Sequence, residues 1–258
     1  MQNIHPTALV HPGAVLAQDV VVGPYAVIED NVTIGARSKI GPHAVIRQYV
    51  EMGEDNEIYQ SASIGEIPQD LKFGGEKSKL IIGNRNRIRE FTTINRGTEG
   101  GGGATVIGDD CFIMVYAHIP HDCHVGNHVI IANSVQIGGH VHIEEHAIIG
   151  GLTGLHQFVR IGAHSMVGAC SAVSQDVPPF VNATGNRATL HGLNAIGLSR
   201  RGFSKETISA LKKAYQILFR SGLTVKDAVE KASAGYGNFP EVKKLLDFVA
   251  SSERGVCR

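Results

Sequence analysis

A histidine and an aspartate stand side by side at His121 and Asp122. An imidazole titrates near neutral pH, so His121 could take a proton from a substrate hydroxyl as a general base. A neighbouring carboxylate can hold the imidazole in one tautomer and stabilise its cation, which is the role we expect for Asp122. The pair predicts acyl transfer by direct attack of a substrate hydroxyl, without a covalent intermediate on the protein.

The pair lies inside a repeat with a period of six residues. Every sixth residue from Ile107 to Val173 is aliphatic, and an apolar series with the same spacing runs from Ile4 to Ile64. A period of six fits neither a single helix nor a single strand. It is typical of a parallel β-helix in which three hexapeptides make one triangular coil of about 18 residues. The apolar anchors should point inward, while the glycine and polar positions turn the corners.

This register predicts which side chains meet. Residues about 18 apart should stack in neighbouring coils, roughly 4.8 Å from one another. His121, Gly139 and Gln157 then form one column, and the backbone N–H of Gly139 could face a developing oxyanion beside His121. Three more histidines should crowd the same edge of the prism, namely His118, His140 and His156.

Two polar interruptions break the repeat, at 66–78 and 96–104. The second shifts the register, because Ile107 follows Ile94 by 13 residues rather than 12. We expect both segments to leave a corner as loops, which is where solenoid proteins often carry their function.

The repeat ends after Val173, and the two prolines that follow cannot sustain a strand ladder. We expect a turn-rich connection over 182–186 and helical periodicity from Leu190. The chain is therefore expected to form an all-β parallel β-helix domain at 1–189 and a small α-helical domain at 190–258.

Three helices are expected in this second domain. Ser204 and Thr224 are good N-cap residues for the first two, and Pro240 suits the first turn of the third.

Composition excludes several classes of partner. Basic and acidic residues both number 24, so the net charge is zero and argues against nucleic acid. No apolar run reaches the roughly 18 residues of a membrane span, and the N-terminal segment lacks the pattern of a secretion signal. The four cysteines form no CxxC pair, and Cys111 and Cys123 fall on inward positions. We expect a cytoplasmic protein without membrane insertion, and we do not expect the inward Cys123 to act as a nucleophile.

Two other interpretations of the histidines stay open. Corner positions accept any polar residue, so each imidazole could simply be solvated. Alternatively, zinc needs three or four ligands converging at about 2 Å, and the gamma-class carbonic anhydrases, which share the hexapeptide repeat, bind it with three histidines across a subunit interface. We favour the acyl-transfer interpretation, with no metal and no cofactor.

Several motifs closely resemble the UDP-N-acetylglucosamine 3-O-acyltransferase family of lipid A biosynthesis, and the resemblance covers essentially the whole chain. They are Ala117-His-Ile-Pro-His-Asp-Cys-His-Val-Gly, Gly138-Gly-His-Val, His156-Gln-Phe, Gln69-Asp-Leu-Lys-Phe, Ile88-Arg-Glu and Gly197-Leu-Ser-Arg-Arg-Gly-Phe. The repeat alone is shared by many acyltransferases, whereas these motifs in this order are specific.

The resemblance implies a homotrimer of left-handed parallel β-helices with active sites between subunits. It implies transfer of an (R)-3-hydroxyacyl group from the phosphopantetheine of acyl carrier protein to the glucosamine 3-hydroxyl of UDP-N-acetylglucosamine, the first step of lipid A biosynthesis. His121 then matches the general base, Asp122 its orienting acid, and Gly139 the oxyanion amide.

The resemblance also assigns residues that bind the substrates. Those expected to contact the sugar nucleotide or the acyl group are His118, His140, His156 and Gln157. Those on the first loop are Gln69, Asp70 and Lys72, the last two offered to the neighbouring subunit's site. Those expected to contact the nucleotide from the C-terminal part are Asn194, Arg200 and Arg201, because paired arginines suit a diphosphate.

A column of small residues on another corner suggests the acyl groove. Asn133, Gly151 and Ala169 lie 18 apart. In the family the residue that matches Ala169 helps to set groove depth. We expect a groove of intermediate to long reach.

Two departures from the family pattern leave the acceptor open. Ile196 stands where the family often has an acid, and Asn95 stands where it often has a histidine. The alternatives are another sugar nucleotide with a 3-amino group, acylation of nitrogen, an acetyl-CoA donor or a non-catalytic scaffold.

Overall fold

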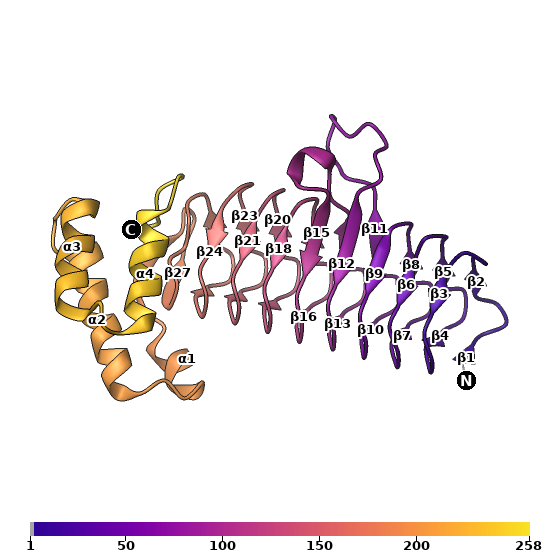
Figure 1. Cartoon of the computed structure of the whole chain (residues 1–258), viewed down its shortest axis with the longest axis horizontal. Helices are drawn as coiled ribbons and strands as arrows, with labels where there is room; N and C mark the ends of the chain where they lie inside the picture. The colour runs from indigo at the N-terminus through magenta and orange to yellow at the C-terminus, as the bar shows by residue number, and fades with distance from the viewer. Residues whose placement is uncertain (1–2) are drawn as a thin grey trace.

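The apolar anchors form short strands that stack into a triangular prism (Figure 1). The computed structural model describes residues 3–258. The strands form three parallel sheets, here called A, B and C. Partners in neighbouring coils lie 18 residues apart, as in the pairs Ile113 with Ile131 and Ile131 with Ile149. The predicted β-helix is confirmed.

Each sheet takes one strand from nearly every coil. Sheet A contains β1 (Asn3–Ile4), β4 (Val21–Val22), β7 (Lys39–Ile40), β10 (Glu57–Ile58), β13 (Arg87–Ile88), β16 (Phe112–Ile113), β19 (Ile130–Ile131), β22 (Ile148–Ile149), β25 (Met166–Val167), β27 (Val181–Thr184) and β28 (Thr189–Leu193). Sheet B contains β2 (Leu9–Val10), β5 (Val27–Ile28), β8 (Val45–Ile46), β11 (Ser63–Glu66), β14 (Thr93–Asn95), β17 (His118–Ile119), β20 (Gln136–Ile137), β23 (Gly154–Leu155) and β26 (Ala172–Val173). Sheet C contains β3 (Val15–Leu16), β6 (Thr33–Ile34), β9 (Val50–Met52), β12 (Lys79–Ile82), β15 (Ala104–Ile107), β18 (His124–Val125), β21 (His142–Ile143) and β24 (Arg160–Ile161).

The structure corrects the expectation that glycines turn the corners of the coils. The glycines that follow the anchors are needed for close approach, because a Cβ added to Gly138 would lie 2.5 Å from the backbone nitrogen of Gln157 in the next coil. The turn itself places a different residue in the left-handed region, as at Asp122 (φ 61°), His140 (φ 59°) and Leu152 (φ 59°). Most corners repeat this pattern, and in the described part of the chain none of these corner residues is Val, Ile or Thr.

Both interruptions form loops that project from the edge between sheets B and C, here called the B–C edge (Figure 1). The first connects β11 to β12, and the second connects β14 to β15 and contains the short 3₁₀ helix η1 (Glu99–Gly101). They lie above neighbouring coils, so the two loops can touch.

Four helices close the C-terminal end of the prism. They are α1 (Ala195–Arg200), α2 (Lys205–Arg220), α3 (Val225–Tyr236) and α4 (Pro240–Ala250). Ser204 and Thr224 cap α2 and α3 by accepting the backbone N–H groups of Thr207 and Asp227. Both predicted caps are confirmed, as is the start of a helix at Pro240. The apolar faces of the four helices form a second core around Leu211, Leu245 and Val249.

Two expectations about the segment that connects the β-helix to the helices were wrong. The segment expected as a turn contains β27, and the segment expected to begin the helices is β28, which pairs antiparallel with β27. β27 continues sheet A beside β25. Pairing with a preformed sheet edge outweighs the local turn composition here. The proposed boundary at 189/190 falls within β28 and stays a prediction.

Among the described residues, no helix has both the length and the apolar character needed to cross a membrane.

Candidate functional site

The centre of the site is a buried histidine–aspartate pair at the B–C edge. His121 Nδ1 lies 2.8 Å from Asp122 Oδ2. The Asp122 side chain is fully buried, and that of His121 is 13% exposed. Because Nδ1 is engaged with the carboxylate, Nε2 is the nitrogen available to a substrate, and it makes no hydrogen bond within residues 3–258. This arrangement suits proton abstraction by His121.

Gly139 lies directly beside this imidazole, as the 18-residue column predicts. A Cβ added to Gly139 would lie 2.9 Å from His121 Nε2 and 2.8 Å from Cε1. The backbone carries the stack onward, since His140 N–H donates to His121 O and Phe158 N–H donates to Gly139 O. The Gly139 N–H donates to no acceptor in the described part of the chain. It is therefore free to stabilise an oxyanion beside His121.

The surroundings of Asp122 include two threonines that the sequence did not point to. Thr98, at the start of the second loop, donates its N–H to Asp122 Oδ1 and its hydroxyl to Asp122 Oδ2, both at 2.7 Å. Thr105 Oγ1 accepts the Asp122 N–H at 2.8 Å. Thr98 lies in a loop, and loop residues carry no six-residue period. The shifted register was therefore the only feature of the sequence that pointed to this segment.

His118 and His140 flank the pair on either side. His118 Nδ1 lies 2.7 Å from Thr93 Oγ1, and burial lowers the pKa of His118 below its ordinary value. The His140 ring meets the His121 ring edge-on, with 5.2 Å between centroids, and stacks on Phe158 at 4.5 Å. The structure therefore brings three of the predicted histidines together. Phe158, half-exposed beside His140, was another residue missed as a candidate.

The first loop overhangs this edge. Asp70 and Lys72 line a hollow that His140 and Phe158 of the same chain also line. Gln69 is exposed on the loop. Asp70 Oδ1 accepts the Lys72 N–H at 3.0 Å, which shapes the turn between them. In one chain these side chains lie near the chain's own site, and a role in a neighbouring subunit stays a prediction.

His156 and Gln157 lie one coil beyond Gly139, and both are exposed. His156 Nδ1 lies 3.2 Å from Arg254 Nη2, so the C-terminal segment reaches this histidine. No direct contact joins His156 to His121 among the described residues. The predicted crowding therefore holds for three histidines, and His156 stands apart from them.

The predicted nucleotide contacts lie on a different edge, between sheets C and A. Asn194 is buried and caps α1, accepting the Gly197 N–H, while its side-chain nitrogen donates to His164 O at 3.0 Å. Arg201 is half-buried close to His146 and His164, and its charge contributes to the lowered pKa values of both histidines. Arg200 is exposed. One chain therefore does not bring these residues to His121.

The two departures have distinct surroundings. Asn95 is buried and donates to Ile67 O at 3.0 Å, so it fastens the base of the first loop to the second. Its Oδ1 has no hydrogen-bond partner among the described residues. Ile196 is 70% exposed on α1, where it is available to a partner or ligand.

The predicted groove column stacks on the edge between sheets A and B. Leu152 N–H donates to Asn133 O at 3.0 Å, and Cys170 N–H donates to Gly151 O at 2.9 Å. Asn133, Gly151 and Ala169 thus follow one another from coil to coil, one strand of sheet B away from the histidines. A role in acyl length stays a prediction.

The cysteines are unsuited to nucleophilic chemistry at this site. Cys123 is buried next to Asp122, and burial raises the pKa of its thiol to about 12. Burial likewise raises the pKa of Cys111 to about 11. Both inward positions are confirmed.

The metal alternative finds one group of possible ligands. His121, Asp122 and His140 offer atoms within 4.8 Å of one another. The set contains two histidines and a carboxylate rather than three histidines. Its first two members are already joined to each other through His121 Nδ1 and Asp122 Oδ2.

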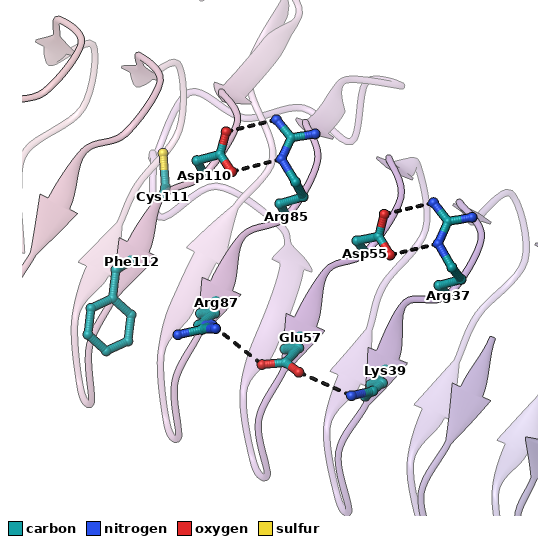
Figure 2. A pocket seen from close by; sticks show the side chains of 9 residues that line it. All are labelled: Arg37, Lys39, Asp55, Glu57, Arg85, Arg87, Asp110, Cys111 and Phe112. Carbon is teal, nitrogen blue, oxygen red and sulfur yellow. Dashed lines mark hydrogen bonds and ion pairs between the residues drawn. The ribbon is translucent and has the colours of Figure 1, made fainter. Parts of the chain in front are cut away.

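A second hollow lies on sheet A in the N-terminal half (Figure 2). Arg37 makes a bidentate pair with Asp55, and Arg85 makes one with Asp110. Glu57 lies between Lys39 and Arg87. Every charged side chain of this hollow pairs with one of opposite sign one coil away, and Glu57 serves two cations, so we interpret this hollow as a ladder of surface ion pairs.

Comparisons with known proteins identify relatives over the whole chain. A family model described as Bacterial transferase hexapeptide (six repeats) matches residues 13–48 and 104–139, and one described as Udp N-acetylglucosamine O-acyltransferase, Domain 2, matches residues 176–257. An acyl-(acyl-carrier-protein)–UDP-N-acetylglucosamine O-acyltransferase from Paraburkholderia phymatum is 53% identical, and one from Paraburkholderia xenovorans is 55% identical. Both alignments cover 100% of each chain.

Solved structures are equally similar. The structure of LpxA from Acinetobacter baumannii superposes with a TM-score of 0.97 at 46% identity, covering 99% of both chains. That of UDP-N-acetylglucosamine O-acyltransferase (LpxA) from Moraxella catarrhalis gives 0.96 at 45% identity, again over 99% of both. The fold is thus a left-handed parallel β-helix with a small C-terminal helical region, as expected.

Proposed function

The chain belongs to the acyl carrier protein-dependent UDP-N-acetylglucosamine O-acyltransferase family, and on this premise we propose its reaction and mechanism. It transfers an (R)-3-hydroxyacyl group from acyl carrier protein to the 3-hydroxyl of UDP-N-acetylglucosamine, the first step of lipid A biosynthesis. One observation carries the mechanism, namely the buried His121–Asp122 pair whose free Nε2 lies beside the unpaired N–H of Gly139.

The reaction proceeds by direct attack. His121 Nε2 removes the proton of the sugar 3-hydroxyl while the oxygen attacks the thioester carbonyl carbon. The carbonyl oxygen becomes an oxyanion, which the Gly139 N–H stabilises. The tetrahedral intermediate then collapses, the C–S bond breaks, and the imidazolium returns the proton to the leaving thiolate of phosphopantetheine. Asp122 holds His121 in the tautomer that presents Nε2 and stabilises its cation. No step requires a cofactor or a metal.

The site residues are divided between two edges of one chain. His121, Asp122 and His140 lie at the B–C edge, whereas Asn194 and Arg201 lie at the edge between sheets C and A. We propose that a homotrimer unites them, so that the C–A edge of one subunit faces the B–C edge of the next. A closed ring of three prisms gives every subunit the same pair of contacts.

The thiols of Cys111 and Cys123 are buried and form no disulfide bond. This suits a reducing compartment, and we propose a cytoplasmic location. Arg200, the last residue of α1, and Arg201, its C-cap, are proposed to contact the diphosphate, and His156 and Gln157 the acyl chain or sugar. Lys72 and Asp70 would reach the acceptor from the first loop.

The test is a transfer assay with UDP-N-acetylglucosamine and a series of 3-hydroxyacyl carrier proteins. Replacing His121→Ala should lower kcat/KM by at least about 1,000-fold, because the base is lost. His124→Ala is the matched control, since this exposed histidine points outward from β18 and should keep activity within about twofold. Near-normal activity of His121→Ala would refute the mechanism. A wild type inactive with every acyl chain would refute the acceptor assignment and direct the assay to a 3-amino sugar nucleotide.

A further inference from the structure

Thr98 has an unusual relation to the site. It lies at the base of the second loop, is only 7% exposed, and gives both of its hydrogen-bond donors to one carboxylate. The loop is also the segment whose insertion shifts the repeat by one residue. The second loop connects β14 to β15, and it also donates two hydrogen bonds from Thr98 to a buried carboxylate of the site.

The hydrogen bonds of Asp122 are completed by this contact. Oδ1 accepts the Thr98 N–H, and Oδ2 accepts the Thr98 hydroxyl and faces His121 Nδ1. The backbone N–H of Asp122 is held by Thr105 Oγ1. A buried carboxylate is costly unless its oxygens accept hydrogen bonds, so Thr98 supplies what the position requires. With these donors fixed, Oδ2 faces two imidazoles, His121 Nδ1 at 2.8 Å and His140 Nε2 at 3.7 Å, and only His121 is at hydrogen-bond distance.

The second loop also packs against the Asp122 carboxylate at Gly101, three residues after Thr98. Gly101 N–H donates to Thr98 Oγ1 at 3.1 Å, which orients the hydroxyl proton toward Asp122. A Cβ added to Gly101 would lie 1.9 Å from Asp122 Cγ, so only glycine fits there. A Cβ added to the neighbouring Gly100 would meet nothing within 4 Å. The loop thus closes over Asp122 at one specific residue.

We propose that Thr98 is a positioning residue for acyl transfer, which acts through Asp122 to fix the orientation of His121, and that Gly101 allows the loop to seat it. This inference rests on the proposed function, because it needs His121 to be the base. Thr98 lines the same hollow as Asp70, Lys72 and His140, but both of its hydrogen-bond donors are bonded to Asp122, so it acts on the reacting atoms only through this carboxylate. Its contribution is to hold the carboxylate so that His121 presents Nε2 at a constant angle to Gly139.

The first experiment compares Thr98→Val with Thr98→Ser. Valine keeps the shape but removes the hydroxyl, and we expect kcat to fall about 10- to 100-fold because a hydrogen bond to a charged group is lost. The KM values for both substrates should stay within about twofold, since valine keeps the shape of the side chain and the hydroxyl that is lost is bonded to Asp122. Serine restores the donor and should recover kcat to within about threefold of wild type. Thr92→Val is the matched control, because it removes another buried threonine hydroxyl, bonded to Met114 O, away from Asp122.

The second experiment is a double-mutant cycle with Asp122→Ala. If Thr98 acts only through Asp122, Thr98→Val should cost less than about twofold more once Asp122 is absent. Independent losses that multiply would overturn the proposal, as would equal kcat for wild type and Thr98→Val. A purely structural role would lower the melting temperature without this loss of additivity.

Gly101→Ala provides a test that does not depend on Thr98→Val folding. It should lower kcat about 10-fold or more, because the added methyl displaces the carboxylate. Gly235→Ala adds a methyl in α3 where nothing lies within 4 Å, and it should stay within about twofold. Equal activity of the two alanine variants would overturn the proposal. If Asp122→Ala itself keeps full activity, the proposed function fails in its mechanism. If Asp122→Ala is impaired but Thr98→Val and Gly101→Ala are not, only the role of Thr98 fails.

Discussion

Two parts of the same prism pair ionisable side chains at its corners, with opposite results. In the ladder of Figure 2, Arg85 is 51% exposed and Asp110 29% exposed, and each carboxylate oxygen is matched by a guanidinium nitrogen. At the B–C edge, Asp122 is fully buried and His121 keeps one nitrogen unpaired. Both pairs lie at corners of the same repeat, with Arg85, Asp110 and Asp122 in the left-handed turn position.

The difference lies in what covers the corner. The ladder faces solvent, where ion pairs contribute little because water screens them. The His121 corner is covered by a loop that shields Asp122 and completes its hydrogen bonds. A corner of the β-helix therefore becomes reactive when an inserted loop buries one partner and leaves the other partly unpaired. The predictions below test this comparison.

The strongest test removes the charge on the covered corner. Asp122→Asn keeps the size of the side chain but lets its amide face His121 with a donor, which favours the wrong tautomer. We expect kcat/KM to fall roughly 100- to 1,000-fold with the fold intact. Steady-state kinetics measure the loss, and circular dichroism checks the fold. A loss of less than about threefold would mean that the buried partner is unnecessary.

A second test asks whether a corner can act through shape alone. Ala169 continues the column of Asn133 and Gly151, so its side chain should limit the depth of the acyl groove. Ala169→Met should shift preference toward shorter 3-hydroxyacyl donors by about 10-fold, and Ala169→Gly toward longer ones. Competition between two acyl carrier proteins of different chain length measures the ratio. An unchanged ratio in both variants would remove this corner from the site.

A third test concerns a half-buried histidine that lies away from His121 in the chain's own fold. His164 stacks between His146 and Phe180, and burial lowers its pKa to about 4. The unfolded chain binds this proton near pH 6.5. The native chain excludes it until about pH 4. The free energy of unfolding should therefore decrease as the pH falls through this window, by about 1–2 kcal/mol after allowing for partial exposure.

Urea unfolding at pH 7 and pH 4.5 measures this decrease. His164→Phe removes the titration while it keeps an aromatic ring on Phe180, so its stability should fall less between the two pH values. His146 also has a lowered pKa and accounts for part of the remaining slope. An identical slope in His164→Phe would show that His164 is not the group responsible.

The smallest effect is expected in the exposed ladder. Arg85→Gln removes a bidentate ion pair with Asp110, yet the melting temperature should change by less than about 2 °C because the pair is solvated. Transfer activity should stay within about twofold of wild type. Differential scanning calorimetry and the transfer assay measure the two quantities. A large loss of activity would mean that this face takes part in the site.

The six-residue period predicted the regular part of the molecule well. Because stacking is set by the coil, the period placed Gly139 beside His121, and the residue types then predicted the pairing of His121 with Asp122. It also predicted that Cys123 points inward. These successes share one cause, since each depends on the regular register and not on a distant segment.

The errors and omissions come from segments without a period. Thr98 reaches Asp122 from a loop whose path no local pattern describes. β27 and β28 look like turn and helix by composition, but an exposed edge of sheet A gives them strand partners. The separation of Arg201 from His121 follows from the position of α1 on the prism. Only the three-dimensional structure shows these contacts.

The left-handed corner residues impose a rule on how the chain can vary. A β-branched side chain is strongly disfavoured at positive φ, whereas Asp, Asn and His tolerate it better. A scan of all substitutions should therefore show poor tolerance of Val, Ile and Thr at corner positions such as Ser134, while many other polar residues survive there. The side chain at each corner can therefore be replaced by another tolerated one without disturbing the neighbouring residues. Asp122 occupies one such corner, so a reactive group can be acquired on this scaffold by changing single residues.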